Sequence, residues 1–401
     1  MHCVTNIHED LYWLGGSDRQ LAKFENVFPI PRGVSYNAYL VLDEKTVLLD
    51  TVDKAVGERF FENLEFALAG RPLDYVVVNH MEPDHCATLG ELLRRWPGAQ
   101  VVANAKTVPM VSQFFDCDIS NRAVVVKEGD TLCTGRHTFT FLMAPMVHWP
   151  EVMVTYDAAD KVLFSADAFG TFGALNGNIF ADQVDFERDW LDDARRYYTN
   201  IVGKYGAQVQ SLLKRAAGME IQMICPLHGP IWRENLEWFL EKYQRWSTYT
   251  PEDRGVAIFC GSIYGHTENA AEILAARLAE RGVKNIALYD VSETDVSELV
   301  AESFRCSHLV LASATYNGEI YTPMENFLRD LACHGLRGRS VALIENGTWA
   351  ARSGMLMTKL LEEMKEMRVM EGTVTLKSSV KEAQRRGLES LADAIADELL
   401  H

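Results

Sequence analysis

The chain has 401 residues, of which 48% are hydrophobic and 24% are charged, and its formal net charge at pH 7 is −17. This length and composition predict two globular domains with full hydrophobic cores. The acidic balance argues against a nucleic-acid-binding protein, which needs a basic face to neutralise phosphates, and it disfavours an anionic membrane surface as partner. No apolar run approaches 18 residues, the N-terminus lacks a signal-peptide pattern, and the eight cysteines form no Cys-x-x-Cys pair. We therefore expect a cytoplasmic protein with reduced thiols, without a zinc ribbon or a rubredoxin-type iron site.

Short apolar runs ended by turn residues dominate residues 1–250, which we expect to form the first domain. Many are rich in Val, Ile, Thr and Phe, as strands are. The expected strands are Tyr39–Leu42, Thr46–Leu49, Tyr75–Val78, Val101–Ala103, Ala123–Val126, Thr138–Met143, Val152–Tyr156, Val162–Phe164 and Ile221–Cys225, and the expected helices are 54–69, 88–95, 106–115 and 187–216. Strands covered by helices predict a layered α/β sandwich.

Four side chains able to bind a metal occur within the segment His80-Met-Glu-Pro-Asp-His85, directly after the expected strand Tyr75–Val78. We expect a loop here, at the carboxyl end of the strand, where rigid sheets commonly hold functional side chains. His148, Asp167 and His228 each follow another expected strand. A single histidine after a strand is more often structural than a ligand, and a single aspartate often caps a turn. Four histidines and three carboxylates together predict a metal site.

The polar segment Tyr249–Gly255 contains Pro and Gly and marks the expected domain boundary, with the second domain over 254–401. From Val256 onward, strands and helices alternate. The expected strands are 256–260, 285–289, 308–312, 340–344 and 373–376, and the expected helices are 268–281, 294–304, 323–334, 353–367 and 380–400. This rhythm predicts a doubly wound, five-stranded parallel sheet.

A turn rich in Ser, Thr and Gly, Gly261-Ser-Ile-Tyr-Gly-His-Thr267, connects the first strand and helix of the second domain. Its main-chain N–H groups and the hydroxyls of Ser262 and Thr267 suit a phosphate at a helix N-terminus. The turn has no lysine and lacks the spaced glycines of a dinucleotide fingerprint, so a mononucleotide such as FMN fits best. A simple serine or threonine helix cap is the alternative.

Two further loops follow strands of the second domain: Ser313-Ala-Thr-Tyr-Asn-Gly318 and Asn346-Gly-Thr-Trp-Ala350. Because the carboxyl ends of parallel strands meet at one sheet edge, both loops are expected beside the phosphate turn. Tyr316 and Trp349 are suited to flank an isoalloxazine ring, although an aromatic side chain taken alone is more often part of a core. The expected flavin-binding residues are Ser262, Ile263, Tyr264, Gly265, His266, Thr267, Ala314, Thr315, Tyr316, Asn317, Gly318, Asn346, Gly347, Thr348 and Trp349.

The metal motif resembles the His-x-His-x-Asp-His signature of the metallo-β-lactamase fold, with Glu82 in place of the second histidine. A carboxylate there makes the site harder and more anionic, which favours iron over zinc. This pattern is similar to that of the flavo-diiron proteins, and the resemblance implies an N-terminal metallo-β-lactamase-like αββα sandwich. It assigns His80, Glu82 and His148 to one iron and Asp84, His85 and His228 to the other, with Asp167 bridging; His85 does not reach the metal in every family member.

The second domain resembles flavodoxin, and its three loops occur in the flavodoxin order. Two positions depart from that family's pattern. Cys260 stands where an aromatic residue is common, and Glu345-Asn346 replaces the usual Phe-Gly. Neither change removes a phosphate donor. The resemblance therefore implies a C-terminal flavodoxin-like sheet that carries FMN.

Over the whole chain, the resemblance implies an oxidoreductase in which FMN passes electrons to a diiron site that reduces O₂ to water, NO to N₂O, or both. It also implies a head-to-tail homodimer or a dimer of such dimers. The chain ends soon after the last expected helix, so electrons are expected from an external donor: a rubredoxin-like protein, a flavoprotein reductase or reduced F420. Two alternatives stay open on the sequence: a metallo-β-lactamase-fold hydrolase with a fused flavodoxin domain, and an electron carrier with a structural metal.

Overall fold

The computed structural model describes residues 2–401 and divides the chain into two compact units. The first unit comprises the residues up to Tyr198 and Ala207–Tyr243, and the second comprises Thr199–Gly206 and Gln244–His401. The second unit thus begins before the break expected at Tyr249–Gly255, and it includes a segment from earlier in the chain. A hydrogen bond within the second unit accounts for part of this difference: the hydroxyl of Tyr249 donates to the main-chain oxygen of Gly203 at 2.8 Å.

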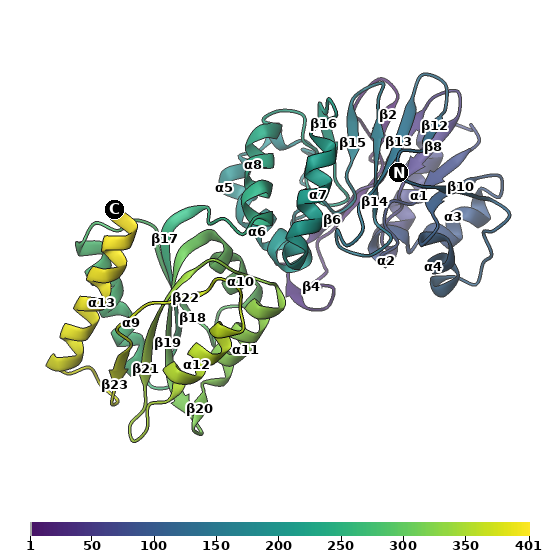
Figure 1. Cartoon of the computed structure of the whole chain (residues 1–401). Helices are drawn as coiled ribbons and strands as arrows, with labels where there is room; N and C mark the ends of the chain where they lie inside the picture. The colour runs from purple at the N-terminus through teal and green to yellow at the C-terminus, as the bar shows by residue number, and fades with distance from the viewer. Residues whose placement is uncertain (1) are drawn as a thin grey trace. The chain divides into compact units, whose positions relative to one another are not determined.

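The first unit is an αββα sandwich of two β-sheets and their flanking helices (Figure 1). One sheet has seven strands in the order β1-β2-β7-β8-β9-β10-β11. They are β1 (Thr5–Asn6), β2 (Leu11–Trp13), β7 (Tyr39–Leu42), β8 (Thr46–Leu49), β9 (Tyr75–Val77), β10 (Gln100–Asn104) and β11 (Ala123–Val126), with helices α1 (Gly57–Leu68), α2 (Pro83–Cys86), α3 (Leu89–Arg95) and α4 (Thr107–Phe114). Strands β8 to β11 are parallel, so their carboxyl ends share one edge.

The other sheet has five strands in the order β12-β13-β14-β15-β16, all antiparallel except the last pair. They are β12 (Thr131–Cys133), β13 (Thr138–Met143), β14 (Met153–Asp157), β15 (Val162–Phe164) and β16 (Met223–Cys225), followed or interrupted by helices α5 (Phe186–Asp189), α6 (Leu191–Tyr197), α7 (Gly206–Ala216) and α8 (Leu236–Ser247). Two small ribbons pair β3 (Gly16–Asp18) with β6 (Val34–Tyr36), and β4 (Lys23–Phe24) with β5 (Phe28–Pro29).

The strands expected in the first domain are confirmed, with ends that shift by at most two residues. The expected single helix over 187–216 is wrong. It is divided into α5, α6, a π-helical turn over Tyr198–Val202, a 3-10 turn over Gly203–Tyr205 and α7. Gly203 and Gly206 lower the helix propensity at this break. The strands before Tyr39 escape prediction because two or three residues leave no periodic pattern.

The second unit is a doubly wound sheet with the strand order β18-β17-β19-β21, and both β22 and β23 pair with β21. Its strands are β17 (Asp253–Gly261), β18 (Ile286–Asp290), β19 (Cys306–Tyr316), β20 (Glu319–Ile320), β21 (Ser340–Asn346), β22 (Arg368–Val369) and β23 (Val374–Leu376), and its helices are α9 (His266–Glu280), α10 (Val296–Arg305), α11 (Thr322–Cys333), α12 (Ser353–Glu362) and α13 (Glu382–Leu400). The five-stranded parallel order is that of flavodoxin-like folds, which confirms the expected class.

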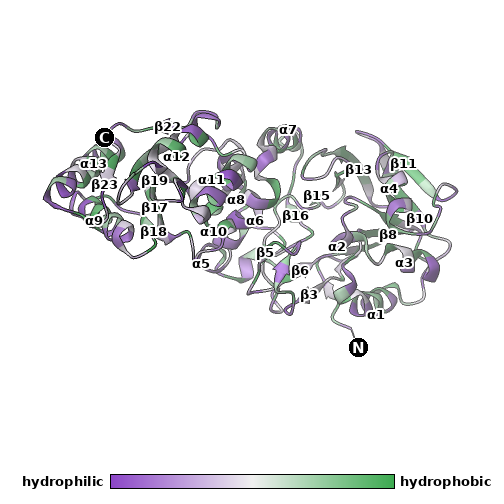
Figure 2. Cartoon of the chain, turned by 90° about the horizontal axis from the view of Figure 1, so that it is seen from below, coloured by the Kyte–Doolittle hydropathy of each residue, from purple (hydrophilic) through white to green (hydrophobic). Residues whose placement is uncertain are grey.

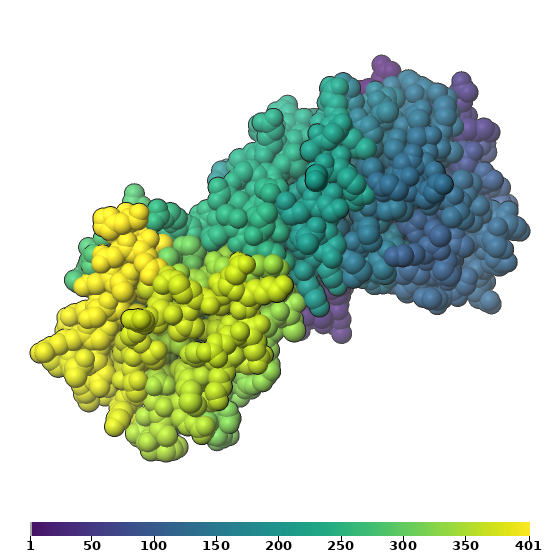
Figure 3. All heavy atoms as spheres, in the orientation of Figure 1, coloured from purple at the N-terminus to yellow at the C-terminus, as the bar shows by residue number. Residues whose placement is uncertain are grey.

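Helices cover both faces of this parallel sheet. One buried cluster contains Leu274 of α9 and Leu391 of α13, and the cluster on the other face contains Leu299 of α10 and Phe327 of α11. In Figure 2, the helices show hydrophilic and hydrophobic residues in alternation, as helices with one face in a core do. Helix α13 lies at the surface of the unit, where its atoms are yellow in Figure 3.

A buried arginine, Arg339, joins several main-chain segments of the second unit. Its side chain is 1% exposed. The guanidinium donates hydrogen bonds of 2.7 to 3.4 Å to the main-chain oxygens of Tyr249, Ser303, Phe304, Arg337 and Gly338. Ser303 and Phe304 lie in the last turn of α10, where carbonyls lack helical partners. Burial lowers the pKa of Arg339 to about 10, so the side chain is still charged at neutral pH.

A buried histidine of the first unit, His137, lies between two carboxylates. Its Nδ1 is 2.8 Å from Oδ2 of Asp157, and its Nε2 is 3.0 Å from Oδ2 of Asp10. Burial opposes protonation, but the hydrogen bonds to Asp157 and Asp10 outweigh burial and raise the pKa of His137 to about 9. Arg136 pairs with Asp160 at 2.7 Å beside them. The cluster is therefore an ion-pair network whose members already have partners.

We expect the first unit to lose stability as the pH rises through about 9. An unfolded histidine has a pKa near 6.5, so the raised folded pKa of His137 stabilises the fold fully below that pH, and the effect disappears above the folded pKa. The loss is on the order of 3 kcal/mol. Urea unfolding at about pH 6 and about pH 10 measures it. His137→Gln should flatten this pH dependence, and an equally steep loss in that variant would contradict the prediction.

Candidate metal and flavin sites

Strand ends place all seven predicted metal-binding side chains together in the first unit. They form two groups: His80, Glu82, His148 and Asp167, and Asp84, His85 and His228. They come from the segments after β9, β13, β15 and β16 and from the short helix α2. Asp84 and His85 were expected in a loop, but they belong to α2, which begins at a proline suited to a first helical turn.

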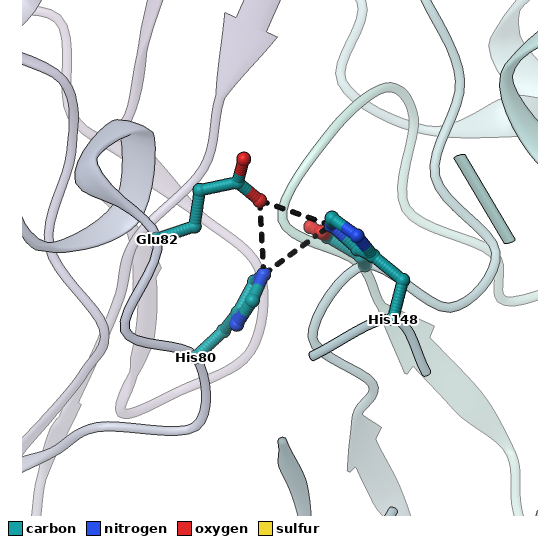
Figure 4. Close-up of side chains that lie close together, drawn as sticks. His80, Glu82 and His148 are labelled. Atoms are coloured by element: carbon teal, nitrogen blue, oxygen red, sulfur yellow. Dashed lines mark hydrogen bonds and ion pairs between the residues drawn. The ribbon is translucent and has the colours of Figure 1, made fainter. Parts of the chain in front are cut away.

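In the first group, two imidazoles converge on the carboxylate of Glu82 (Figure 4). Nε2 of His80 is 3.1 Å and Nε2 of His148 is 3.0 Å from Oε2 of Glu82. Oδ2 of Asp167 lies 3.3 Å from the same nitrogen of His80 and 3.2 Å from that of His148. Two nitrogens and two carboxylate oxygens thus surround one point, as the ligands of a single cation do.

Asp167 faces the second group through its other oxygen. Oδ1 of Asp167 is 3.0 Å from Nε2 of His85 and 3.7 Å from Nε2 of His228. Oδ2 of Asp84 is 3.3 Å and 3.2 Å from these two nitrogens. Because its two oxygens point to different groups, Asp167 has the geometry of a carboxylate that bridges two cations.

Several of these ligand atoms are buried without a hydrogen-bond partner in the described chain. They are both carboxylate oxygens of Asp84, both ring nitrogens of His85, Oδ1 of Asp167 and Nε2 of His228. Buried polar atoms are nearly always paired in folded proteins. Cations between the two groups would satisfy these oxygens and Nε2 atoms, so the residues fit a pair of metal ions.

The charge balance of the cluster also favours bound cations. Burial opposes ionisation of Asp167, but the imidazoles of His85 and His80 outweigh it and hold the pKa of its carboxyl well below the ordinary value. Burial likewise opposes protonation of His148, yet Asp167 and Glu82 raise its pKa to about 9. Carboxylates that hold protons on neighbouring imidazoles attract metal cations, which bind by replacing those protons.

Two of the histidines make a hydrogen bond through Nδ1, the ring nitrogen that faces away from the other ligands, with residues that the sequence did not predict. Nδ1 of His80 is 2.8 Å from Oε1 of Glu151, and Nδ1 of His228 is 2.7 Å from the main-chain oxygen of Ser35. Each contact favours the Nδ1–H tautomer and leaves Nε2 free for a metal. The acidic residue in His148-Trp-Pro-Glu151 was a usable sequence signal. The carbonyl of Ser35 was not, because every residue has one.

Aromatic side chains that were not predicted also line the cluster. The ring centroids of Tyr197 and Phe24 lie 5.4 Å and 5.3 Å from that of His228. The hydroxyl of Tyr197 is buried and has no hydrogen-bond partner among residues 2–401. Burial, together with the carboxylates of Asp167 and Asp84, raises the pKa of Tyr197 well above its ordinary value. A neutral phenol with a free O–H donor therefore stands beside the metal ligands.

The predicted flavin segments of the second unit lie at one sheet edge, because β17, β19 and β21 are parallel neighbours. Two of the loops are shorter than expected, since Ala314–Tyr316 belong to β19 and Asn346 belongs to β21. Asn317 and Gly318 form the turn from β19 into β20, with φ of 52° and 81°. Asn-Gly is the sequence that such a tight hairpin turn favours.

The turn after β17 leads into α9, a helix of 15 residues that begins with His266 and Thr267. Gly265 is the N-terminal cap of α9 and has a φ of 82°, a conformation that favours glycine. Its N–H donates to Oγ of Ser262 at 3.1 Å. The turn therefore presents the positive end of a long helix, together with two hydroxyl-bearing side chains, and it fits a phosphate.

The aromatic side chains of these segments are exposed rather than part of the core. Tyr264 is 88% exposed and Trp349 is 93% exposed, and Tyr316 is also open to solvent. The core-packing alternative for Tyr316 and Trp349 is therefore wrong. Exposed large aromatic side chains often mark a binding surface, and these offer flat apolar faces to an isoalloxazine ring.

Asn346 connects the flavin segments to a fourth one that was not predicted. Its Nδ2 donates to Oγ1 of Thr267 at 3.2 Å and to the main-chain oxygen of Ser378 at 2.9 Å. The N–H of Ser378 donates to Oδ1 of Asn346 at 2.9 Å, and the hydroxyls of Ser378 and Thr348 lie 2.9 Å apart. The segment after β23 thus supports the same edge.

Known proteins combine the same two domains. A family model described as ODP family beta lactamase matches residues 34–229, and a flavodoxin model matches residues 258–374. The chain is 30% identical over 359 residues to an anaerobic nitric oxide reductase flavorubredoxin of Vibrio vulnificus, covering 88% of this chain and 71% of that protein. The structure of the present chain matches that of the rubredoxin oxygen:oxidoreductase of Desulfovibrio gigas, with a TM-score of 0.92 and 28% identity over 99% of both chains. A flavodiiron protein from Giardia intestinalis matches with a TM-score of 0.90 and 24% identity, over 100% of this chain and 99% of that chain.

Proposed function

Because the chain belongs to the flavodiiron protein family, we propose that it is an oxidoreductase that reduces O₂ to water, NO to N₂O, or both, at two iron ions held by the first unit. When bound, FMN and the iron pair supply the electrons for this reduction. One relative is named a nitric oxide reductase and another an oxygen oxidoreductase, so both substrates are proposed. The observation that carries the proposal is Asp167, which places one carboxylate oxygen in each of two ligand groups.

We assign the ligands by these two groups. His80, Glu82 and His148 would hold one iron, and Asp84, His85 and His228 would hold the other, with the carboxylate of Asp167 shared. The free phenol of Tyr197 would donate a hydrogen bond to a substrate oxygen between the ligands, since burial keeps it protonated.

The donor set supports iron rather than zinc. Four imidazoles and three carboxylates make a hard, anionic site, whereas structural zinc sites favour nitrogen and sulfur. Cys86 is next to His85 in sequence, but its thiol donates to the main-chain oxygen of Met81 at 2.9 Å, and burial raises the pKa of Cys86 well above its usual range. Cys86 therefore stays protonated and is not a metal ligand.

Metal analysis and anaerobic single turnover test the proposal. The purified protein is expected to hold two iron ions and one FMN per chain. After full reduction and mixing with O₂ or with NO, it is expected to reoxidise with at least one of them, and the two rates give its preference. A hydrolase of the same fold would hold two zinc ions and no iron, and an iron- and FMN-loaded protein inert to both gases would refute the reductase.

Removal of both exposed aromatics, Tyr264→Ala with Trp349→Ala, should weaken FMN binding roughly tenfold to a hundredfold, because each aromatic contact contributes about 1 kcal/mol. Both side chains are exposed, so the melting temperature of the FMN-free protein should hardly change. Quenching of FMN fluorescence on titration measures the affinity. Phe66→Ala, at an exposed aromatic of the first unit, is the matched control. Unchanged FMN affinity in the double variant would contradict the proposed flavin site.

We further propose a head-to-tail homodimer, or a dimer of dimers, in the cytoplasm, which receives electrons from a rubredoxin-like protein, a flavoprotein reductase or reduced F420. The exposed aromatic side chains at the flavin segments support access by a partner. Within residues 2–401, none of the helices is long and apolar enough to cross a membrane. Sedimentation of the FMN-loaded protein tests the assembly, and stopped-flow reduction by each donor class tests the electron source.

A further inference from the structure

His80 is held on both sides of its ring by carboxylates. On the metal side, its Nε2 faces Glu82 and Asp167. On the other side, Oε1 of Glu151 accepts from Nδ1 of His80 at 2.8 Å and from the N–H of Met81 at 2.9 Å. Glu151 is 1% exposed, so solvent hardly screens its charge from the imidazole.

Glu151 is itself fixed by the surrounding fold. Its main-chain oxygen accepts a hydrogen bond from the side-chain amide of Asn104, at the end of β10. It lies in the segment between β13 and β14 that also carries His148. Its Oε2 has no hydrogen-bond partner in the described chain, so the contacts that the carboxylate makes are those to His80 and Met81.

Among the described residues, no carboxylate accepts a hydrogen bond from Nδ1 of either histidine of the second ligand group. Nδ1 of His228 faces the neutral main-chain oxygen of Ser35, and Nδ1 of His85 has no partner within residues 2–401. The two groups therefore differ in one buried carboxylate, that of Glu151, which is hydrogen-bonded to the far nitrogen of a ligand imidazole. A carboxylate that accepts the N–H of a metal-bound imidazole makes the opposite nitrogen more basic and a stronger ligand.

We propose that Glu151 is a positioning residue that makes the two iron sites unequal: it tightens metal binding at the site of His80, Glu82 and His148 and lowers the reduction potential of that iron. Extra negative charge stabilises the more highly charged, oxidised ion, so the site of Asp84, His85 and His228 is the more readily reduced of the two. The inference rests on the proposed diiron function.

Glu151→Gln on the full, FMN-loaded chain tests this inference, because glutamine keeps an oxygen for His80 and Met81 but removes the charge. Iron is removed by chelation, and Fe²⁺ is returned anaerobically in competition with a chelator. Wild type should bind two ions, and the variant should bind one of the two roughly tenfold to a hundredfold more weakly while the other step is unchanged. In a redox titration followed by Mössbauer spectroscopy, one iron of the variant should shift to a more positive potential.

Two further variants separate charge from position. Glu151→Asp keeps the charge and should return the potential toward that of wild type, even if the shorter side chain weakens binding. Glu44→Gln, at an exposed glutamate of the β7–β8 turn, is the matched control. Wild-type affinities and potentials in Glu151→Gln, or equal weakening of both steps, would overturn the inference and leave the proposed function intact. Fewer than two iron ions in wild type would instead overturn the proposed function.

Discussion

Asp167→Asn is expected to leave FMN binding intact, to remove at least one iron ion per chain, and to slow turnover with O₂ and with NO by more than about a hundredfold. Removal of a residue that hydrogen-bonds to a metal ligand typically lowers metal affinity or activity tenfold to a hundredfold. Removal of a ligand that both ions share should lower them more. Asparagine offers one oxygen where Asp167 offers two, and it carries no charge. One ligand group therefore loses its carboxylate oxygen from Asp167, and both groups lose the negative charge of that carboxylate.

Iron analysis, FMN absorbance and single-turnover rates of the purified variant measure these effects. Asp118→Asn, in the exposed segment between α4 and β11, is the matched control and should behave as wild type. Two iron ions with wild-type rates in Asp167→Asn would show that this carboxylate does not bridge the metals, and the ligand assignment would fail with it.

Arg339→Met is expected to destabilise the second unit by about 3 to 5 kcal/mol. The substitution keeps an unbranched buried side chain but leaves five main-chain carbonyls without their donor. Each carbonyl that stays unpaired costs about 1 to 3 kcal/mol, and the total stays below the sum for five because water reaches some of them. Urea unfolding followed by the release of FMN fluorescence reports on this unit. The iron content of the first unit should not change.

Arg339→Lys distinguishes the guanidinium fork from charge alone. An ammonium keeps the charge but cannot reach the same carbonyls with a planar fork, so an intermediate loss of stability is expected. Arg386→Met, at an exposed arginine of α13, is the matched control and should shift stability by less than about 0.5 kcal/mol. A loss this small at Arg339 would mean that the carbonyls find other partners.

Strand patterns and their ends carried most of what could be predicted. Runs such as Thr138–Met143 are long enough for composition and alternation to identify a strand, and polar ligands stand out directly after them. Glu82 separates this site from the zinc sites of the same fold through its chemistry alone, since a carboxylate replaces an imidazole. The order of the phosphate turn and the two later segments identified the flavin edge for the same reason: each follows an apolar strand.

The remaining features depend on contacts that a linear pattern does not contain. The break in the helix over 187–216 coincides with Thr199–Gly206, which belongs to the second unit. Gly203 and Gly206 weaken the helix there, but glycine alone does not show that the segment packs with another unit. Arg339 looks like a surface charge in sequence, and only the converging carbonyls explain its burial. Tyr197 lies within a helical pattern, where an aromatic residue indicates core packing as readily as a role beside a metal.

Each ligand group of the first unit takes side chains from both sheets: His80, Glu82, Asp84 and His85 follow a strand of the larger sheet, and His148, Asp167 and His228 follow strands of the smaller one. During synthesis, the chain therefore has no complete iron site until β16 has been made and the two sheets have docked. Iron loading is then a late step of folding. Because the bound ions contact side chains from both sheets, their binding free energy adds to the free energy of unfolding. Iron starvation would thus shorten the lifetime of the protein as well as its activity.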